Sequence, residues 1–458
     1  MIDVSLAAVG LPELDVPQAR PPIGADGYAS RLAALASRVA ADRVVVYGDR
    51  EHYANLSFFS GFDPRFEEAL LVVGGGRPVL LVGNEGWSYA TIVPAEVDVV
   101  LCPALSLMGQ DRSRGPRLPD ALRDAGVANG ASVGLVGWKS LERAEWDAEV
   151  PPLAAAGFVV DALRHLVGPG GTVFDATPAV MNPVDGLRAL NTPDQIAAFE
   201  WAASRASRAV ARILLGTRPG LTELEAVSSM GYAGEPLSAH VMFSSGPQVA
   251  VGLRSATARP IELGDAATTA VGFWGGLSCR AGLIAPASAL DANGRAYLEQ
   301  LAIPYWRAIA TWYQTVRLGV TGGEIDATIG ETLAGTGIGA ALNPGHLTHL
   351  DEWVHSPIRP GSSDPIVSGM ALQCDIIPDT TRERWAANCE DTVVVADAAL
   401  RAELAARHPE VWRRVEARRD FVRARLGLDI ADELLPLSNT PAYFPPFWLS
   451  PESALVAG

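Results

Sequence analysis

Over the first 180 residues, short apolar runs alternate with amphipathic stretches. The runs at 43–50 and 67–83 are rich in Val and Leu, and three glycines at 74–76 interrupt the second run, as expected for two strands joined by a turn. Residues 27–42 and 115–127 carry apolar positions at helical spacing. Strands that alternate with helices predict an α/β domain in this part of the chain.

A composition change near residue 180 indicates a domain boundary. Residues 177–193 contain three prolines and several polar turn residues. We therefore expect an N-terminal domain over 1–182 and a C-terminal domain over 183–458. Thr192 and Pro193 suit the cap and the first turn of a long helix that ends near Gly216.

The C-terminal domain is predicted to mix strands and helices. Strand-like runs occupy 236–290 and return after 366, and a long helix is predicted over 291–317. Pro409 interrupts the charged amphipathic stretch 398–427, which predicts a pair of helices. The segment 437–451, rich in Pro and aromatic residues, is expected to pack back on the domain as extended chain.

Charge and composition exclude several classes of partner. The net charge of −16 argues against a nucleic-acid backbone or an anionic membrane surface, because both need cationic neutralisation. No stretch approaches the roughly 20 apolar residues of a membrane span, the N-terminal segment has no basic start typical of a signal peptide, and the four cysteines have no disulfide-like spacing. We expect a soluble cytoplasmic protein.

Several segments resemble the creatinase, prolidase and Xaa-Pro aminopeptidase superfamily, and they occur in the order of that family. Each is a weak signal alone. The segments are 53–73, 190–210, 220–225, 243–251, 261–276, 342–352, 368–378 and 389–397. The resemblance implies a creatinase-like α/β domain followed by a pita-bread domain, which is a curved antiparallel sheet flanked by helices.

The resemblance also implies a homodimer, in which the N-terminal domain of one subunit approaches the active site of the other. Phe62 and Arg65 would then reach the pocket of the partner and bind substrate. The alternative is a turn at Asp63 and Pro64 with an exposed arginine.

Metal-dependent members of the superfamily hold two divalent ions with two Asp, one His and two Glu. Here the first Asp is expected at Thr269 or Ala270 and the second, about eleven residues later, at Arg280. The sequence contains no acidic residue from 266 to 290, so both aspartates are missing. The other three positions are occupied by the ligand-type residues His346, Asp375 and Glu390.

Arg280 is expected to enter the former metal pocket and to pair with Asp375 or Glu390, where a guanidinium would repel a cation. This favours an enzyme without a metal. A single divalent metal at His346, Asp375 and Glu390 is the less favoured alternative. If the strand register slips by one residue, Arg280 lies on the surface instead.

The segment 345–357 is the densest polar cluster of the chain. His349 or His355, tuned by Asp351 or Glu352, is a candidate general acid or base beside His346. The alternative for each histidine is a hydrogen-bonded core residue.

Two further residues are candidates for substrate binding, and three cysteines neighbour the site. Arg254 and Arg280 together would suit a carboxylate substrate, and His240 lies one strand earlier. We expect Cys279, Cys374 and Cys389 to be small core residues rather than ligands or nucleophiles.

These residues support one main hypothesis and two alternatives. The main hypothesis is a metal-independent hydrolase or lyase that acts on a C–N bond of a small, amino-acid-like carboxylate, as the metal-free members of the superfamily do on small polar molecules. The alternatives are a non-catalytic pita-bread protein that binds a ligand and a peptidase-like hydrolase with one metal.

Overall fold

The computed structural model describes the chain except for residues 1, 13, 148, 150 and 380–383. It divides into two compact units, residues 23–189 and a unit made of residues up to Pro22 together with 190–458. Residues 2–22, expected in the N-terminal domain, pack with the C-terminal unit, because β1 (Val4–Ala8) pairs antiparallel with β17 (Ser453–Ala457).

The N-terminal unit is a six-stranded mixed sheet in the order β5-β4-β3-β2-β6-β7. The glycine-interrupted run forms β3 and β4 as predicted, and all three glycines of the turn have positive φ. The strands are β2 (Arg43–Gly48), β3 (Ala69–Val73), β4 (Val79–Val82), β5 (Asp98–Leu101), β6 (Ser132–Val136) and β7 (Thr172–Asp175).

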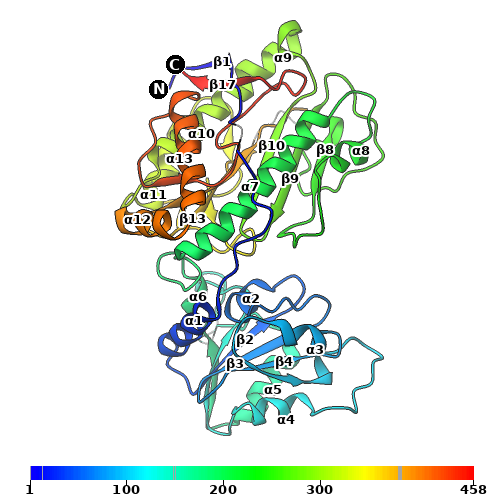
Figure 1. The fold of residues 1–458 in the computed structure, drawn as a ribbon, viewed down its shortest axis with the longest axis vertical. Coiled ribbons are helices and arrows are strands. Elements are labelled where there is room, and N and C mark those ends of the chain that lie inside the picture. Colours follow the sequence, from blue (N-terminus) through cyan, green and yellow to red (C-terminus); the bar gives the residue numbers. More distant parts are fainter. Residues whose placement is uncertain (1, 13, 148, 150, 380–383) are drawn as a thin grey trace. The chain divides into compact units, whose positions relative to one another are not determined.

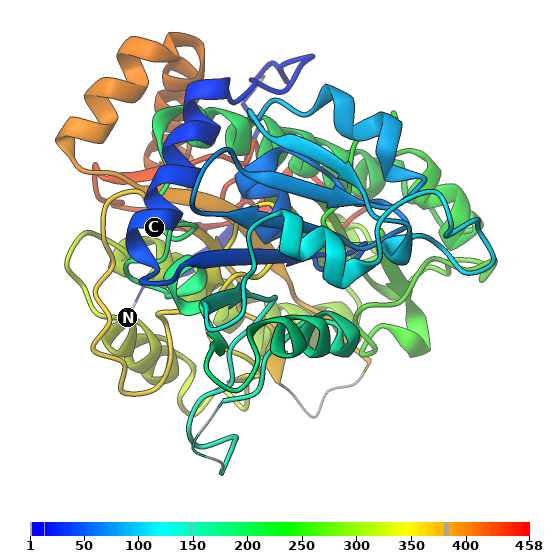
Figure 2. The same cartoon turned by 90° about the horizontal axis from the view of Figure 1, so that it is seen from below.

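Helices cover both faces of this sheet (Figure 2). One face packs against α4 and α5 through a cluster that includes Val45, Leu122 and Leu163, and the other face carries α1 and α2. The helices are α1 (Ala25–Arg38), α2 (Ala54–Ser60), α3 (Gly86–Tyr89), α4 (Leu118–Asp124), α5 (Gly157–Val167) and α6 (Pro178–Met181).

The C-terminal unit is built on an antiparallel sheet in the order β12-β13-β15-β10-β9-β8, with β16 paired to β15. The long helix α7 (Pro193–Gly216) lies across β9 and β10 (Figure 1). The strands are β8 (Met242–Ser245), β9 (Ala266–Phe273), β10 (Gly276–Leu283), β12 (His346–Leu347), β13 (Ala371–Cys374), β15 (Cys389–Val395) and β16 (Leu434–Pro436). A second small sheet pairs β11 (Gly339–Ala340) with β14 (Pro378–Asp379).

Local sequence signals determine most helix boundaries in this unit. The Thr192 hydroxyl accepts from the backbone N–H of Gln195 at the start of α7, and Thr222 forms a capping box at the start of α8 (Glu223–Ser228). The helix predicted over 291–317 is instead α9 (Ala292–Tyr297) and α10 (Ile303–Thr315), joined by a π-helical turn over 298–302 that ends just before Pro304. The remaining helices are α11 (Gly322–Leu333), α12 (Ala398–Arg407) and α13 (Pro409–Ala424).

The aromatic-rich segment 437–451 packs as extended chain, as predicted. Trp448 and Phe447 are fully buried, and the backbone groups of Leu283 at the end of β10 bond to Pro446 and Trp448. The segment thereby covers the face of β10 that carries Arg280, which contacts Tyr443. None of the described helices is long and apolar enough to cross a membrane.

Candidate active site

A cavity of about 550 Å³ lies on one face of the sheet of the C-terminal unit. A volume of this size suits a small organic ligand. Antiparallel register places Met242, Ala270, Cys279 and Glu390 in one row across β8, β9, β10 and β15. Because directly opposed residues share a face of a sheet, this row forms the floor of the cavity.

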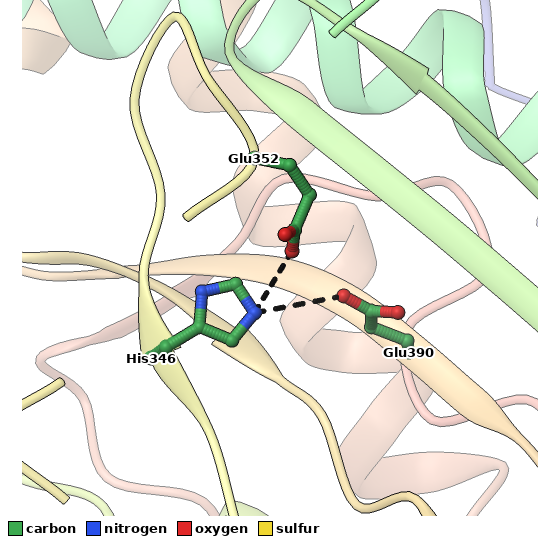
Figure 3. Close-up of side chains that lie close together, drawn as sticks. All are labelled: His346, Glu352 and Glu390. Carbon is green, nitrogen blue, oxygen red and sulfur yellow. Dashed lines mark ion pairs between the residues drawn. The ribbon is translucent and has the colours of Figure 1, made fainter. Parts of the chain in front are cut away.

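His346 on β12 is the centre of a polar cluster at the β15 side of the cavity (Figure 3). Its Nε2 lies 2.9 Å from Glu352 Oε1, 3.9 Å from Asp375 Oδ2 and 4.0 Å from Glu390 Oε1. The imidazole stacks on the indole of Trp353, with ring centroids 4.0 Å apart. His346 is fully buried, so these contacts and its packing hold the ring in one orientation.

Burial and repulsion between carboxylates shift Asp375 and Glu390 towards protonation. Burial raises the pKa of Asp375 to about 6, although His346 opposes the shift. Burial, reinforced by Asp375 and Glu352, raises the pKa of Glu390 well above its ordinary value. Burial alone would lower the pKa of His346, but Glu352 and Asp375 outweigh it and raise that pKa.

Two oxygens of the cluster have unused bonding capacity. Asp375 Oδ1 and Glu390 Oε1 are buried and accept no hydrogen bond from the described residues. A buried oxygen of this kind needs a proton, a water or a ligand. The cluster is therefore an acceptor-rich end of the cavity.

Thr268 and Cys279 occupy the place at which two aspartates were expected. Both line the cavity, with the hydroxyl and the thiol 3.8 Å apart, and they are eleven residues apart in the chain. Cys279 lies one residue before the second expected position, Arg280, which is on the other face of the sheet. Thr268 likewise lies before the first expected position, Thr269 or Ala270. Burial raises the pKa of the Cys279 thiol well above its ordinary value, so this group is a neutral thiol and not a thiolate.

The prediction that Arg280 enters the pocket is wrong. Its Nη2 donates to Asp391 Oδ2 at 2.7 Å, and its Nε donates to the carbonyl of Tyr443 at 2.6 Å. Further bonds run to the carbonyls of Glu390 and Thr440. The register pairs Arg280 with Cys389, and both lie on the sheet face opposite Glu390. The alternative, in which a register shifted by one residue leaves Arg280 on the protein surface, is also wrong, because Arg280 is buried.

The structure places the other candidate histidines away from the cavity lining. His349 is buried and packs edge-to-face against Phe199 of α7. The Nδ1 of His355 accepts from the backbone N–H of Ser356 at 2.8 Å. Neither histidine lines the described cavity. His346 does not line it either, but it contacts Glu352, Asp375 and Trp353, which do.

Arg254 lines the cavity and His240 supports it indirectly. Among the described lining residues, Arg254 is the only arginine or lysine, while Glu352, Asp375, Asp379 and Glu390 are acids. His240 is exposed, and its Nε2 donates to the carbonyl of Leu253 at 2.7 Å. His240 therefore anchors the residue before Arg254 rather than facing the cavity.

Phe62 and Arg65 have partners within the N-terminal unit. Phe62 is 1 % exposed and packs near Tyr89, which removes it as a surface contact. Arg65 forms an ion pair with Asp63 at 2.9 Å and lies over the Tyr89 ring. The exposed aromatic side chain of this loop is Phe66. A role for Arg65 at the site of a partner subunit stays a prediction.

Sequence reasoning missed the apolar part of the cavity. Met242, Leu277 and Trp385 line it, and Trp353 both lines it and covers His346. Strict alternation along β10 would have found Leu277 and Cys279 as neighbours on one face. Trp353 has no such signal, because it lies in an irregular segment. Cys374 and Cys389 are buried and do not line the cavity, in agreement with small core residues.

Comparisons with known proteins identify the fold. No family model and no curated protein matches the chain. Among solved structures, the chain is similar to dipeptidase PepE from Mycobacterium ulcerans (TM-score 0.58, 21 % identity, covering 82 % of this chain and 94 % of that one). It is also similar to an Xaa-Pro dipeptidase from Bacillus anthracis (0.60, 17 %, 82 % and 96 %) and to the prolidase from Pyrococcus horikoshii OT3 (0.61, 15 %, 80 % and 95 %). The chain therefore has the two-domain pita-bread fold of the creatinase and prolidase superfamily.

The residues present do not fit the two-metal centre that this superfamily implies. β9 and β10 contribute a hydroxyl and a thiol to the cavity where two carboxylates would be needed. His346, Glu352 and Glu390 do offer three ligand atoms within 4.8 Å of one another. This set fits one divalent cation, and one of its members, Glu352, lies outside the ligand set expected from the sequence.

Proposed function

We propose that the protein is a hydrolase that cleaves a C–N bond in a small, amino-acid-like carboxylate without a two-metal centre. The observation that carries the proposal is the contact between His346 Nε2 and Glu352 Oε1 at 2.9 Å, beside Asp375, at the wall of a cavity of ligand size that Glu352 and Asp375 line. The solved structures with this fold include proteins described as dipeptidases and prolidases, which supports hydrolysis as the reaction class.

The hydrogen bonding of His346 defines where its proton lies. Nδ1 lies 3.2 Å from the carbonyl of Leu347 and donates its hydrogen bond to it. The other ring nitrogen, Nε2, faces Glu352. A lone pair on Nε2 and a carboxylate would repel each other at this distance, so we place a shared proton between the two groups. The pair is thereby a proton donor held against the cavity.

The proposed reaction uses this pair as the general acid and Asp375 as the general base. Water attacks the carbon of the C–N bond and loses its proton to Asp375. The C–N bond then breaks with its electron pair on nitrogen, and the nitrogen takes the shared proton from Glu352, the member of the pair that lines the cavity. Asp375 Oδ2 lies 3.9 Å from Nε2, so the proton can return to His346 and restore the site.

A second candidate function is a hydrolase with one divalent cation. It is favoured by the ligand atoms of His346, Glu352 and Glu390, and by the displacement of Arg280 to the other face, since the predicted repulsion of a cation is thereby removed. When bound, such a cation would polarise the bond to be cleaved and lower the pKa of a bound water.

One set of assays separates these functions. The protein, purified without chelators, is analysed for Mn, Zn and Fe and then tested on a panel of unblocked dipeptides and N-acyl amino acids, with and without EDTA. Turnover that survives EDTA supports the main proposal. Turnover that EDTA removes and one equivalent of cation restores supports the second. Turnover that His346→Ala leaves unchanged contradicts both.

The homodimer and the cytoplasmic location stay predictions. Size-exclusion chromatography with light scattering of the full chain measures the first. A monomer at all concentrations would remove the proposed contribution of Arg65 to a partner subunit.

A further inference from the structure

The cavity has acidic groups at one side and a single guanidinium at the other. Glu390 belongs to β15, and Glu352 and Asp375 cluster with it around His346. Arg254 lines the same cavity beside β8, which is the last strand of the sheet on the opposite side. No ion pair joins Arg254 to an acid among the residues that the structure describes. The two charged regions are therefore separate.

Sheet geometry gives the scale of this separation. The order of strands from Glu390 is β15, β10, β9 and β8, and the backbone N–H of Phe243 on β8 donates to the carbonyl of Arg254 at 2.9 Å. Arg254 thus flanks the outer edge of β8. Four steps of about 4.8 Å give roughly 19 Å between the backbones of Glu390 and Arg254, measured along the sheet. Both side chains extend into the cavity and shorten this span.

The surface between the two regions is apolar. Met242, Ala270, Leu277 and Cys279 pack together on the cavity floor, between β8 and β15. Trp385 lines the cavity as well. A ligand that spans the cavity would therefore bury apolar surface along its middle, which is favourable by about 25 cal/mol per Å².

The Arg254 guanidinium offers a donor that the protein does not use. Its Nη1 is buried and donates no hydrogen bond to any described residue. Burying such a donor without an acceptor is costly, and a carboxylate is the acceptor that matches a guanidinium best. The backbone before it is constrained, because Leu253 has a φ of 64° and its carbonyl accepts from His240 Nε2. His240 is accordingly a positioning residue for Arg254.

We infer that the cavity takes an elongated carboxylate, with its carboxylate on Arg254, an apolar body over Met242 and Leu277, and its C–N bond beside Glu352 and Asp375. The ligand class is that of an ω-acylamino carboxylate, in which a chain of several CH₂ groups separates the carboxylate from the C–N bond, and not a short guanidino acid, in which a single carbon separates them. The position of the C–N bond rests on the proposed function. The carboxylate on Arg254 and the apolar body do not.

Binding measurements test the inference without any turnover. The probes are 6-acetamidohexanoate, its primary amide with the same apolar chain, and guanidinoacetate, each titrated by calorimetry into the full-length protein. The acid should bind about 10- to 100-fold more tightly than the amide, as expected for hydrogen bonds to a charged group. Guanidinoacetate should bind more weakly than the acid, because it lacks the apolar body.

Variants assign the preference to Arg254. Arg254→Met should abolish the advantage of the acid over the amide and leave the affinity of the amide within a few fold. His240→Ala should reduce the advantage of the acid less than Arg254→Met does. Arg317→Met, which changes an exposed arginine of the same unit that does not line the cavity, is the matched control and should behave as wild type.

Several outcomes would overturn the inference. These are equal affinity of wild type for acid and amide, an acid preference that survives Arg254→Met, guanidinoacetate binding as tightly as the acid, or binding of none of the probes. Thermal unfolding of each variant shows whether it is folded. If His346→Ala keeps the acid preference but any turnover is independent of His346, the proposed function fails while the carboxylate site stands.

Discussion

Replacement of Arg280 by methionine should destabilise the C-terminal unit strongly and leave ligand binding in the cavity intact. The guanidinium is 2 % exposed and donates to Asp391 and to main-chain carbonyls, including that of Tyr443. Methionine fills a similar volume but donates no hydrogen bond. In the variant the Asp391 carboxylate stays buried without its guanidinium partner. Its hydrogen bonds from Ser438 and the backbone N–H of Ala442 compensate the buried charge only in part.

The magnitude follows from the geometry of the pair. At 2.7 Å, opposite unit charges attract by about 6 kcal/mol with an effective dielectric constant of 20. The cost of removing both charges from water offsets much of this attraction, so the intact pair contributes little net stability. Loss of one partner is different, because a buried charge remains, and the expected cost is about 3–5 kcal/mol in the free energy of unfolding.

Chemical denaturation followed by tryptophan fluorescence measures this cost, since eight of the 11 tryptophans belong to residues 190–458. The matched control is Arg254→Met, the same substitution at a cavity-lining arginine, with an expected change below about 1 kcal/mol. A second variant, Arg280→Met combined with Asp391→Asn, removes the buried charge and should recover part of the lost stability.

The reasoning fails if Arg280→Met unfolds at the denaturant concentration of the wild type, or if it abolishes binding of the carboxylate probe while remaining as stable as wild type. Either result would place the guanidinium in the cavity, as the sequence had suggested. If Arg280→Met alone does not fold, the double variant still tests the reasoning. A folded, soluble double variant would show that the unpaired Asp391 carboxylate caused the misfolding of the single variant.

Further predictions concern the metal, the pH dependence of stability and the catalytic cluster. Thr268→Asp combined with Cys279→Asp should allow the protein to bind one more equivalent of Mn²⁺ than wild type in calorimetric titration, whereas the same change made one residue later in each strand should not. Glu200 is fully buried between two arginines, which hold its pKa below the ordinary value although burial opposes them. Because the pKa of Glu200 is lower in the folded than in the unfolded protein, the ionised carboxylate stabilises the fold fully above about pH 4.5, and this stabilisation is lost as the pH falls below that value. The difference in unfolding free energy between wild type and Glu200→Gln should therefore shrink from pH 7 to pH 3. Glu352→Gln should lower turnover by about 10²- to 10⁴-fold without changing the thermal midpoint by more than a few degrees, while Asp379→Asn, at an exposed acid of the same cavity, should change turnover little.

Local signals in the sequence predicted much of the fold because they act over a few residues. The cap at Thr192, the helix start at Pro409 and the turn at 74–76 all depend on neighbours in the chain, and the structure has each of them. The helix predicted over 291–317 was interrupted by a π-helical turn. Pro304, in the first turn of α10, is a local signal for this interruption, because proline cannot donate the hydrogen bond of a continuous helix.

The face of a strand is harder to predict than its existence. Because side chains alternate, an error of one residue moves every side chain to the other face of the sheet. That error placed Arg280 in the pocket, where the structure has Cys279. The error does not affect the conclusion that the aspartates are missing, because residues 266–290 contain no acid and neither register places a carboxylate in the pocket. The missing aspartates were therefore predictable, whereas the residues in their place were not.

The charge balance of the cluster now depends on the segment after β12 and not on Arg280. Glu352 and Trp353 come from that segment, and they contact His346 from the side of the cavity through an ion pair and a ring stack. Because the Arg280 guanidinium pairs with Asp391 on the other face of the sheet, three carboxylates share one imidazole, so the cluster must bind protons or a cation to remain buried. Acid–base catalysis uses the protons, and the single-cation alternative replaces them. Because a proton and a cation compete for the same oxygens, cation affinity should rise with pH, and a protein that holds none at neutral pH has the protonated cluster that the proposed mechanism requires.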